Sequence, residues 1–325
     1  MKLLLVGMES NNLFRTECII KHAIRKNFDN IELYIVDLLD YIKNEGCIVA
    51  NEFLYNERAK LAPDIVLYSG VEALDVNNFS NYNLAKQIIW FYDAPFHVNV
   101  CKFGNLVDHL FITAQGLVED YKYWGVDCHW LLEGIHDPPH LKRDQIYNLF
   151  ETDIAFVGTP DMRRNTLLER VHCEAQGHLK IWGSPIGPPY FGLDDYTWHE
   201  QLPYSDTWVD GGDYPYLCSS AKIILGINIY NDIYQYFSNR NLFTMGCGGF
   251  LLTHYVPGME ELFINHQHLV WYKDFDECIY LINYYLKHEE KRQEIQNNAF
   301  LFAHENYSMT QQLQKMFNIC GIEMS

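Results

Sequence analysis

The residues best suited to chemistry lie together in residues 238–253. This segment opens with Ser238, Asn239 and Arg240, and glycines at positions 246, 248 and 249 precede an apolar run. The order predicts a polar loop, a short helix, a glycine hinge and a buried strand. The first amides of a helix lack partners within it, and its dipole favours anions. The loop is therefore suited to phosphate, and Arg240 can add a bidentate charged contact.

A second cationic segment has a similar setting. Gly158 and Thr159 follow an apolar run, and Arg163 and Arg164 stand where the next helix should begin. Either arginine is placed to reach a diphosphate from the side opposite Arg240, while the other is expected on the surface of the first helical turn. The chain contains no G-x-x-x-x-G-K-[ST], and no G-x-G-x-x-G follows its first strand. ATPase and standard dinucleotide-binding functions are therefore disfavoured.

Groups suited to acid–base chemistry follow an apolar run in the first half of the chain. Asp93 and His97 come after residues 87–92, and either is a candidate general base for an acceptor hydroxyl. The alternative is structural: Asp93 caps the following turn and His97 packs there. His136 and Asp137 are further candidates, with a hinge role equally open.

The sequence gives little support for a metal site. Asp274 and Asp276 form a D-x-D pattern that could hold a divalent ion. Their place between a strand and a helix instead favours Asp276 as a helix N-cap. The histidines show no zinc spacing such as H-E-x-x-H. Neither a bound metal nor another cofactor is therefore expected.

Residues 184–220 form an insertion that is rich in aromatic and acidic residues and contains no Lys or Arg. It is expected to be an ordered loop. Trp198 and Trp208 could stack against the apolar face of a sugar while nearby carboxylates bind its hydroxyls. Packing of the loop on the second domain is the alternative.

The secondary-structure elements that position these residues can be predicted from apolar runs, which alternate with segments of helical spacing. The pattern predicts strands at 2–6, 31–36, 63–68, 87–92, 109–113 and 128–132, and again at 153–159, 179–183, 223–227, 249–252 and 268–272. Helical spacing occurs at 16–25, 165–171, 276–287, 289–303 and 309–317. Buried runs of this kind predict parallel sheets covered on both faces, and hence two doubly wound, Rossmann-like α/β domains.

The proline-containing residues 136–140 indicate an interdomain linker. We therefore expect an N-terminal domain at 1–143, a C-terminal domain at 144–303 and a final helix within 304–325. Ligands of such sheets bind at the carboxyl ends of the strands, and the Arg240 segment is expected at such an edge. The ligand should then lie in a cleft between the domains.

Composition limits the partners and the compartment. The chain of 325 residues carries a formal charge of −18, which disfavours nucleic acid and anionic membrane surfaces. An anionic ligand therefore needs a local basic pocket. The first apolar run is too short for a signal peptide or a membrane span. Nine cysteines without a C-x-x-C pair predict free thiols in a reducing, cytoplasmic compartment.

The order and spacing of these segments resemble a known family, the two-domain GT-B glycosyltransferases, and within them the group similar to the spore maturation protein CgeB. The likeness covers most of residues 108–317. It is carried by residues 153–159 with Arg163 or Arg164, 221–228, 238–252, 256–263, 269–272 and 284–286 with Arg292.

This resemblance implies a transferase that moves a sugar from a nucleoside-diphosphate sugar, such as a UDP-sugar, to a hydroxyl of a glycan, a protein or a small molecule. The donor would lie on the C-terminal domain and the acceptor on the N-terminal one. Family members generally need no metal, because basic side chains stabilise the leaving diphosphate, and their last helix crosses back to the first domain. The donor residues implied are Gly158, Thr159, Arg163, Arg164, Ser238, Asn239, Arg240 and Gly248.

One position departs from the family pattern. Many members carry a glutamate three residues after the arginine, where it holds the donor ribose, but this chain has Phe243 there. Glu260 or Glu261 is the expected replacement. A protein that binds a nucleotide-sugar without catalysis therefore stays open. A nucleotide-sugar epimerase also stays open, because the same architecture hosts that chemistry.

Overall fold

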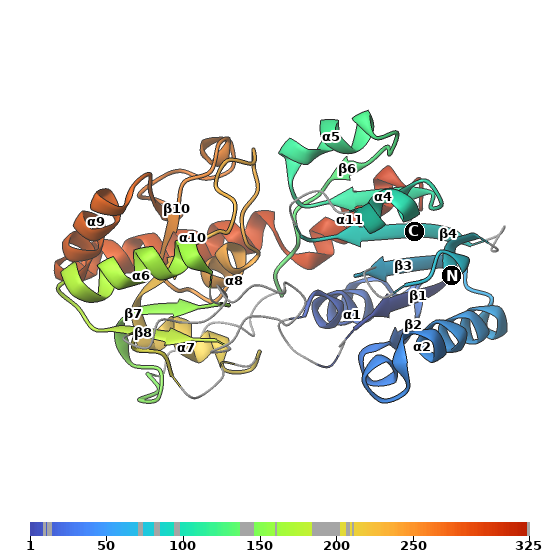
Figure 1. Cartoon of the computed structure of the whole chain (residues 1–325), viewed down its shortest axis with the longest axis horizontal. Helices are drawn as coiled ribbons and strands as arrows, with labels where there is room; N and C mark the ends of the chain where they lie inside the picture. Colours follow the sequence, from blue (N-terminus) through green and yellow to red (C-terminus); the bar gives the residue numbers. More distant parts are fainter. Residues whose placement is uncertain are drawn as a thin grey trace. The chain divides into compact units, whose positions relative to one another are not determined.

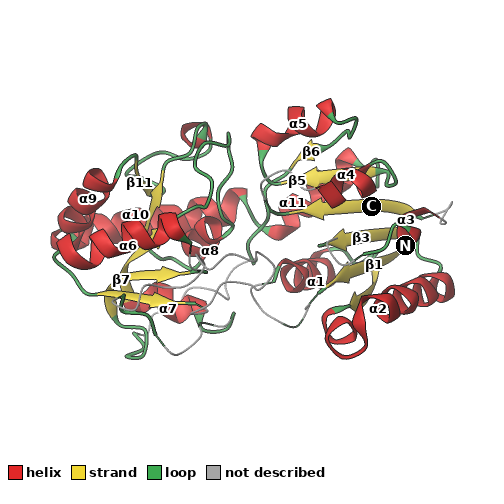
Figure 2. Cartoon of the chain, viewed as in Figure 1, coloured by secondary structure: helices red, strands yellow, loops and turns green. Residues whose placement is uncertain are grey.

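The chain forms two compact units, each built on one parallel sheet with helices packed around it, as Figure 1 and Figure 2 show. The structure, a computed structural model, describes residues 1–8, 11, 15–70, 74–80, 85–93, 98–136, 146–159, 161–183, 202–205, 209 and 211–323. Unit 1 comprises Met1–Asp137, Ile233–Tyr236 and Tyr307–Ser325. Unit 2 comprises Pro138–Asp232 and Phe237–Asn306.

Unit 1 contains a six-stranded sheet with the order β2-β1-β3-β4-β5-β6. Its strands are β1 (Lys2–Gly7), β2 (Glu32–Asp37), β3 (Ile65–Ser69), β4 (Lys86–Phe91), β5 (His109–Ile112) and β6 (His129–Trp130). Its helices are α1 (Thr16–Asn27), α2 (Leu39–Leu61), α3 (Asn77–Ser80), α4 (Val98–Gly104), the 3-10 turn η1 (Gln115–Leu117), α5 (Val118–Tyr123) and α11 (Met309–Ile319).

Unit 2 contains a five-stranded sheet with the order β11-β10-β9-β7-β8. Its strands are β7 (Thr152–Val157), β8 (Leu179–Trp182), β9 (Ala221–Gly226), β10 (Leu251–His254) and β11 (Val270–Tyr272). Its helices are α6 (Met162–Glu174), α7 (Tyr214–Ser220), α8 (Arg240–Gly246), the 3-10 turn η3 (Met259–Glu261), α9 (Phe275–Lys287) and α10 (Glu289–Asn306).

Burial on both faces explains why the strands are continuous apolar runs. Every residue of β3 is buried, and so are five of the six residues of β1. Neighbouring strands pair in parallel throughout both sheets. Parallel strands need crossover connections that place helices on the sheet faces, so both faces are buried from solvent. The two Rossmann-like α/β domains expected from sequence are confirmed.

The last helix returns to unit 1, as the resemblance implied. Ser308 begins α11 with a capping box closed by Gln311. The main chain of Ile135 accepts a hydrogen bond from Met309 N at 2.9 Å, and the rings of Phe28 and Phe317 meet edge to face at 5.6 Å. A side chain at Gly134 would collide with the backbone of Met309, so glycine permits this close packing.

Five helices were not predicted from sequence, namely α2, α3, α4, α5 and α7. α2 contains Gly46 in a left-handed conformation (φ 87°), which kinks it and disrupts the apolar periodicity on which the prediction depends. Tyr214–Ser220, expected as part of a loop, forms α7, which begins with Pro215 in its first turn. Among the described residues, no helix combines the length and apolar character needed to cross a bilayer.

Candidate functional site

The carboxyl edge of the unit 2 sheet carries the cationic segments singled out from sequence. From β7 the chain passes to β8 on one side and then returns to β9 on the other side of β7. Ligands of open α/β sheets bind where connections diverge in this way. Gly183, which follows β8, packs against the carbonyl of Gly158, which follows β7, and any side chain at Gly183 would collide with it. The edge is therefore closely packed backbone.

Two guanidinium groups lie against one buried ring at this edge. The Cζ atoms of Arg240 and Arg164 are 5.4 Å and 5.7 Å from the centroid of Phe156, whose side chain is fully buried. A Cβ atom at Gly158 would lie 3.1 Å from Nη2 of Arg240 and 2.9 Å from the Phe156 ring. Gly158 thus leaves room for the guanidinium, and the ring face stabilises the charge.

Arg164 braces the backbone of the edge. Its Nε donates to Ile227 O at 3.2 Å, and its Nη1 donates to the carbonyl and hydroxyl oxygens of Thr159 at 2.9 Å and 3.1 Å. Only 5% of its surface is exposed. Arg164 therefore ties the turn after β7 to the segment after β9. Arg163 is exposed at the start of α6, and its Nη1 donates to Ile229 O at 2.8 Å.

The loop before α8 is closed by side-chain contacts. Asn228 Oδ1 accepts a hydrogen bond from Ser238 N at 3.0 Å, and Ser238 Oγ lies 3.4 Å from Arg240 N. Ser238, Asn239 and Arg240 are each half-buried. At the base of the helix, Thr244 Oγ1 donates to Arg240 O at 2.8 Å. The predicted order of loop, short helix, glycine turn and strand is confirmed, with α8 beginning at Arg240.

Gly248 is not brought together with Arg240. It lies beyond the opposite end of α8, in the left-handed conformation (φ 74°), and its N–H donates to Met245 O at 3.0 Å. Gly249 N donates to Thr244 O at 2.9 Å. This pattern satisfies the last carbonyls of a helix and favours glycine because φ is positive. The structure thus places Gly248 as the terminator of α8.

Phe243 and Glu260 have different surroundings. The Phe243 side chain is 7% exposed within α8, so this position belongs to the hydrophobic core. Glu260 is exposed in η3, after β10, and accepts hydrogen bonds from Tyr255 Oη at 3.1 Å and 2.9 Å. Burial and the bond to Glu260 raise the pKa of the Tyr255 phenol. Tyr255 therefore orients the Glu260 carboxylate.

The D-x-D pattern has a structural role, but the predicted N-cap was wrong. Asp274, not Asp276, caps α9, and its Oδ1 accepts a hydrogen bond from Glu277 N at 2.8 Å. Asp276 instead pairs with Arg170 at 2.8 Å. The helix begins at Phe275, so the capping position, which is the residue before it, falls on Asp274.

In unit 1, Asp93 is exposed just after β4, at the carboxyl edge of the sheet. His97 lies outside the described residues, and so do Trp198 and Trp208. His136 is buried, with its ring centroid 5.7 Å from that of His22.

Sequence reasoning missed Glu133 at the same edge of unit 1. It is buried beyond β6 and accepts a hydrogen bond from Thr16 Oγ1, and Asp93 and Glu17 lie within electrostatic range. Burial raises the pKa of Glu133 to about 8, against the lowering effect of the Thr16 bond. The available signal was a single acid inside the apolar stretch Leu131–Ile135.

Comparisons with known proteins agree with this architecture. Residues 163–318 match the family described as glycosyl transferase-like. Three solved structures have similar folds, each with 99% of both chains covered. They are Anabaena HepE in complex with UDP-glucose (TM-score 0.69, 12% identity), an alpha-glucosyltransferase in complex with UDP-glucose and DNA containing an abasic site (0.66, 12%), and sucrose-phosphate synthase from Thermosynechococcus elongatus (0.65, 11%). No curated protein sequence matches.

The family match covers α6 through most of α11, including the Arg240 segment, and the similar structures span both units. The two parallel sheets and the similar structures agree on the fold, and the family match is to glycosyl transferase-like proteins. The chain thus has the two-domain GT-B fold, and its residues 163–318 are glycosyl transferase-like.

Proposed function

We propose that the protein transfers a sugar from a UDP-sugar to a hydroxyl acceptor, and that Arg240 binds the donor diphosphate. The observation that carries this proposal is the half-buried Arg240 guanidinium, 5.4 Å from the Phe156 ring at the carboxyl edge of unit 2. A guanidinium can bind a diphosphate through two parallel hydrogen bonds. HepE was solved with UDP-glucose, which supports uridine as the base.

The other residues of this edge have complementary roles in the proposal. Exposed Arg163 contacts the diphosphate, whereas buried Arg164 holds Thr159 and Gly158 in place. Ser238 and Asn239 line the entry to α8. Glu260, oriented by Tyr255, takes the ribose hydroxyls in place of the family glutamate.

Transfer in this scheme needs no metal ion. Negative charge develops on the leaving diphosphate, and fixed guanidinium groups stabilise it without reorganisation. The carboxylates of the D-x-D pattern are engaged in the α9 cap and the Arg170 ion pair. The proposal therefore assigns the charge stabilisation to arginine.

The acceptor is a hydroxyl of a glycan, a protein or a small molecule, bound by unit 1. Asp93, exposed at the carboxyl edge of that unit, is the proposed general base, with His97 as the alternative. Trp198 and Trp208 are proposed to stack on a sugar. All nine cysteines are free thiols, which is compatible with a proposed cytoplasmic location.

A thermal-shift screen with UDP-, GDP-, dTDP- and CMP-sugars tests donor binding. A ligand at 100 times its dissociation constant adds about 2.7 kcal/mol to folding stability, so the UDP-sugars should raise Tm. The absence of a shift with every donor would overturn the proposal.

Product analysis then separates the three functions. A transferase forms a glycosylated product and UDP only when the acceptor is present, apart from slow hydrolysis. Conversion of the nucleotide-sugar without an acceptor identifies an epimerase. Tight binding with neither transfer nor hydrolysis identifies a binding protein.

A further inference from the structure

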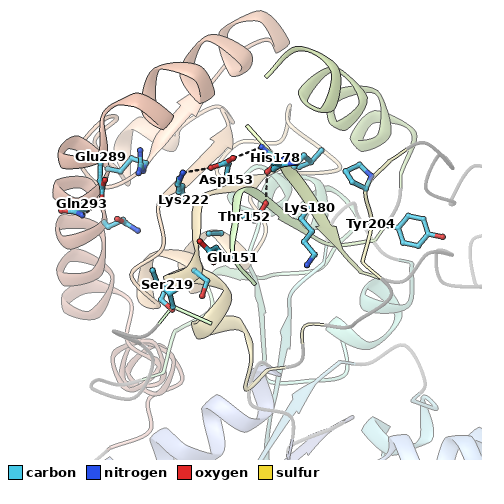
Figure 3. Close-up of a pocket in the computed structure, with 17 residues that line it drawn as sticks. Glu151, Thr152, Asp153, His178, Lys180, Tyr204, Ser219, Lys222, Glu289 and Gln293 are labelled. Carbon is cyan, nitrogen blue, oxygen red and sulfur yellow. Dashed lines mark hydrogen bonds and ion pairs between the residues drawn. The ribbon is translucent and has the colours of Figure 1, made fainter. Parts of the chain in front are cut away.

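A cavity lies at the amino edge of the unit 2 sheet, opposite the edge that carries Arg240. Its volume is about 810 Å³, within the usual range for ligand sites. The first residues of β7, β8 and β9 form its floor, and one face of α10 forms a wall (Figure 3). Asp153 in this cavity lies five positions before Gly158 at the carboxyl edge, a distance of about 17 Å along the extended strand. The cavity is therefore distinct from the proposed donor site.

Charges in this cavity are balanced. Its lining contains three cationic residues and three acidic ones, namely Lys180, Lys222 and Arg292, and Glu151, Asp153 and Glu289. The chain as a whole carries −18. An anionic ligand such as a nucleotide or a phosphate therefore gains no net attraction there.

The cations of this cavity also have acceptors within the protein. Lys222 Nζ pairs with Asp153 Oδ1 at 2.7 Å, and Figure 3 shows this contact beside the bond from His178 N to Asp153. Lys180 Nζ donates to Leu149 O at 3.1 Å and lies 5.0 Å from the Trp182 ring. Arg292 Nη1 donates to Tyr285 O. These partners reduce the number of N–H donors that the cations have available for a phosphate.

The remaining polar groups suit hydroxyls. Glu289, Gln293 and Gln296 lie on one face of α10, at spacings of four and three residues. Gln293 Nε2 donates to Glu289 Oε1 at 3.0 Å, which places an amide beside a carboxylate. Such a pair offers donors and acceptors to neighbouring hydroxyls. Tyr204, 38% exposed, provides an aromatic surface on another side of the cavity (Figure 3).

We infer that this cavity binds an uncharged saccharide, in which α10 contacts the hydroxyls and Tyr204 contacts the apolar face of a sugar ring. The site would hold a carbohydrate away from the carboxyl edge. It does not depend on the proposed donor or on the transfer reaction.

Binding of neutral oligosaccharides to the full chain tests this inference. Maltohexaose, xylohexaose and mannohexaose would each be titrated calorimetrically up to about 10 mM, a range that detects millimolar affinity. At least one of them should bind. Failure of all three to bind overturns the inference.

Variants locate the binding. Gln293→Ala combined with Gln296→Ala should raise Kd about tenfold, because two hydrogen-bonding amides are lost. The matched control is Glu290→Ala, an exposed position on the same helix outside the cavity lining, which should leave Kd unchanged. Equal affinity in the double variant contradicts the site.

A last comparison separates this site from the donor site. Arg240→Ala should leave oligosaccharide binding unchanged, and loss of binding there would move the ligand to the carboxyl edge and overturn the inference. UDP titrated into the double variant should bind as in the unaltered chain. Failure of the UDP experiment alone would count against the proposed function and not against this cavity.

Discussion

At its carboxyl edge, the unit 2 sheet carries arginines, whereas the unit 1 sheet carries carboxylates. The residues compared are Arg163, Arg164 and Arg240 in unit 2 with Glu17, Asp93 and Glu133 in unit 1. Arginine stays charged at every physiological pH, but a buried carboxyl group changes its protonation near neutrality. The same doubly wound architecture thus places permanently charged side chains at this edge in one unit and titratable carboxyl groups in the other.

The largest expected effect concerns Glu133. Burial raises its pKa from 4.5 to about 8, so between these values the folded chain holds a proton that the unfolded chain has lost. The contribution of this group to the free energy of unfolding therefore falls as pH rises from 4.5 to 8, by up to roughly 4 kcal/mol. Glu133→Gln should lack this loss in urea unfolding measured from pH 5 to 8.5.

The control for Glu133 is Glu119→Gln. Glu119 is 81% exposed in unit 1 and forms a surface pair with Lys122, so this variant should keep the pH dependence of the unaltered chain. If the free energy of unfolding depended on pH in the same way for Glu133→Gln and the unaltered chain, Glu133 would not change its protonation as described.

The next prediction tests whether the hydrogen bonds of Arg164 stabilise the carboxyl edge of the unit 2 sheet. Arg164→Met keeps the aliphatic stem but removes the donors to Ile227 O and Thr159 O, and these acceptors are buried or half-buried. The free energy of unfolding should fall by about 3 kcal/mol. Arg163→Met, at an exposed position, should cost less than about 1 kcal/mol in the same urea titration. Equal losses would remove the distinction between the two arginines.

A third prediction concerns ligand affinity. Arg240→Ala should weaken UDP binding by about 1.5–3 kcal/mol, or roughly 10- to 150-fold in Kd, because a charged hydrogen-bonding group is lost. Calorimetry would measure the change. Arg170→Ala, which removes a surface ion pair with Glu174 and Asp276, is the matched control and should bind UDP normally. Unchanged affinity in Arg240→Ala would place the diphosphate elsewhere.

The smallest effect is expected at Asp276. Its ion pair with Arg170 is at the surface, with 87% of the Asp276 side chain exposed, so Asp276→Asn should change stability by less than about 1 kcal/mol. Transfer activity should be the same with Mg²⁺ and with a chelator. Activity that requires Mg²⁺ and is lost in Asp276→Asn would restore the D-x-D pattern as a metal site.

The fold could be predicted because buried parallel strands are apolar runs that local sequence displays. Helix α2 could not, because Gly46 breaks its periodicity. In the site, the position of Arg240 at the start of a short helix was predictable from order alone. The brace formed by Arg164 was not, because its acceptors, Ile227 O and Thr159 O, are backbone atoms on different segments.

The roles of the acidic residues could not be predicted from sequence for the same reason. Glu133 has no periodic or spaced partner in sequence, and its partner Thr16 is 117 positions away. Its raised pKa arises from burial, which only the packed sheet creates. Asp274 and Asp276 were recognised as a pair, but the N-cap lies two residues before the predicted one, so Asp274 caps the helix and Asp276 pairs with Arg170.

The short segment Ile233–Tyr236 has a practical consequence for dividing the molecule. It belongs to unit 1 although it lies between β9 and α8 of unit 2. Tyr234 O accepts a hydrogen bond from Gly116 N at 2.9 Å, and Ile233 and Tyr236 pack on the unit 1 core. A fragment cut at 138 and 306 would therefore expose apolar side chains whose partners remain in the other piece. The two halves are interleaved in sequence, so neither is a self-sufficient module for domain exchange.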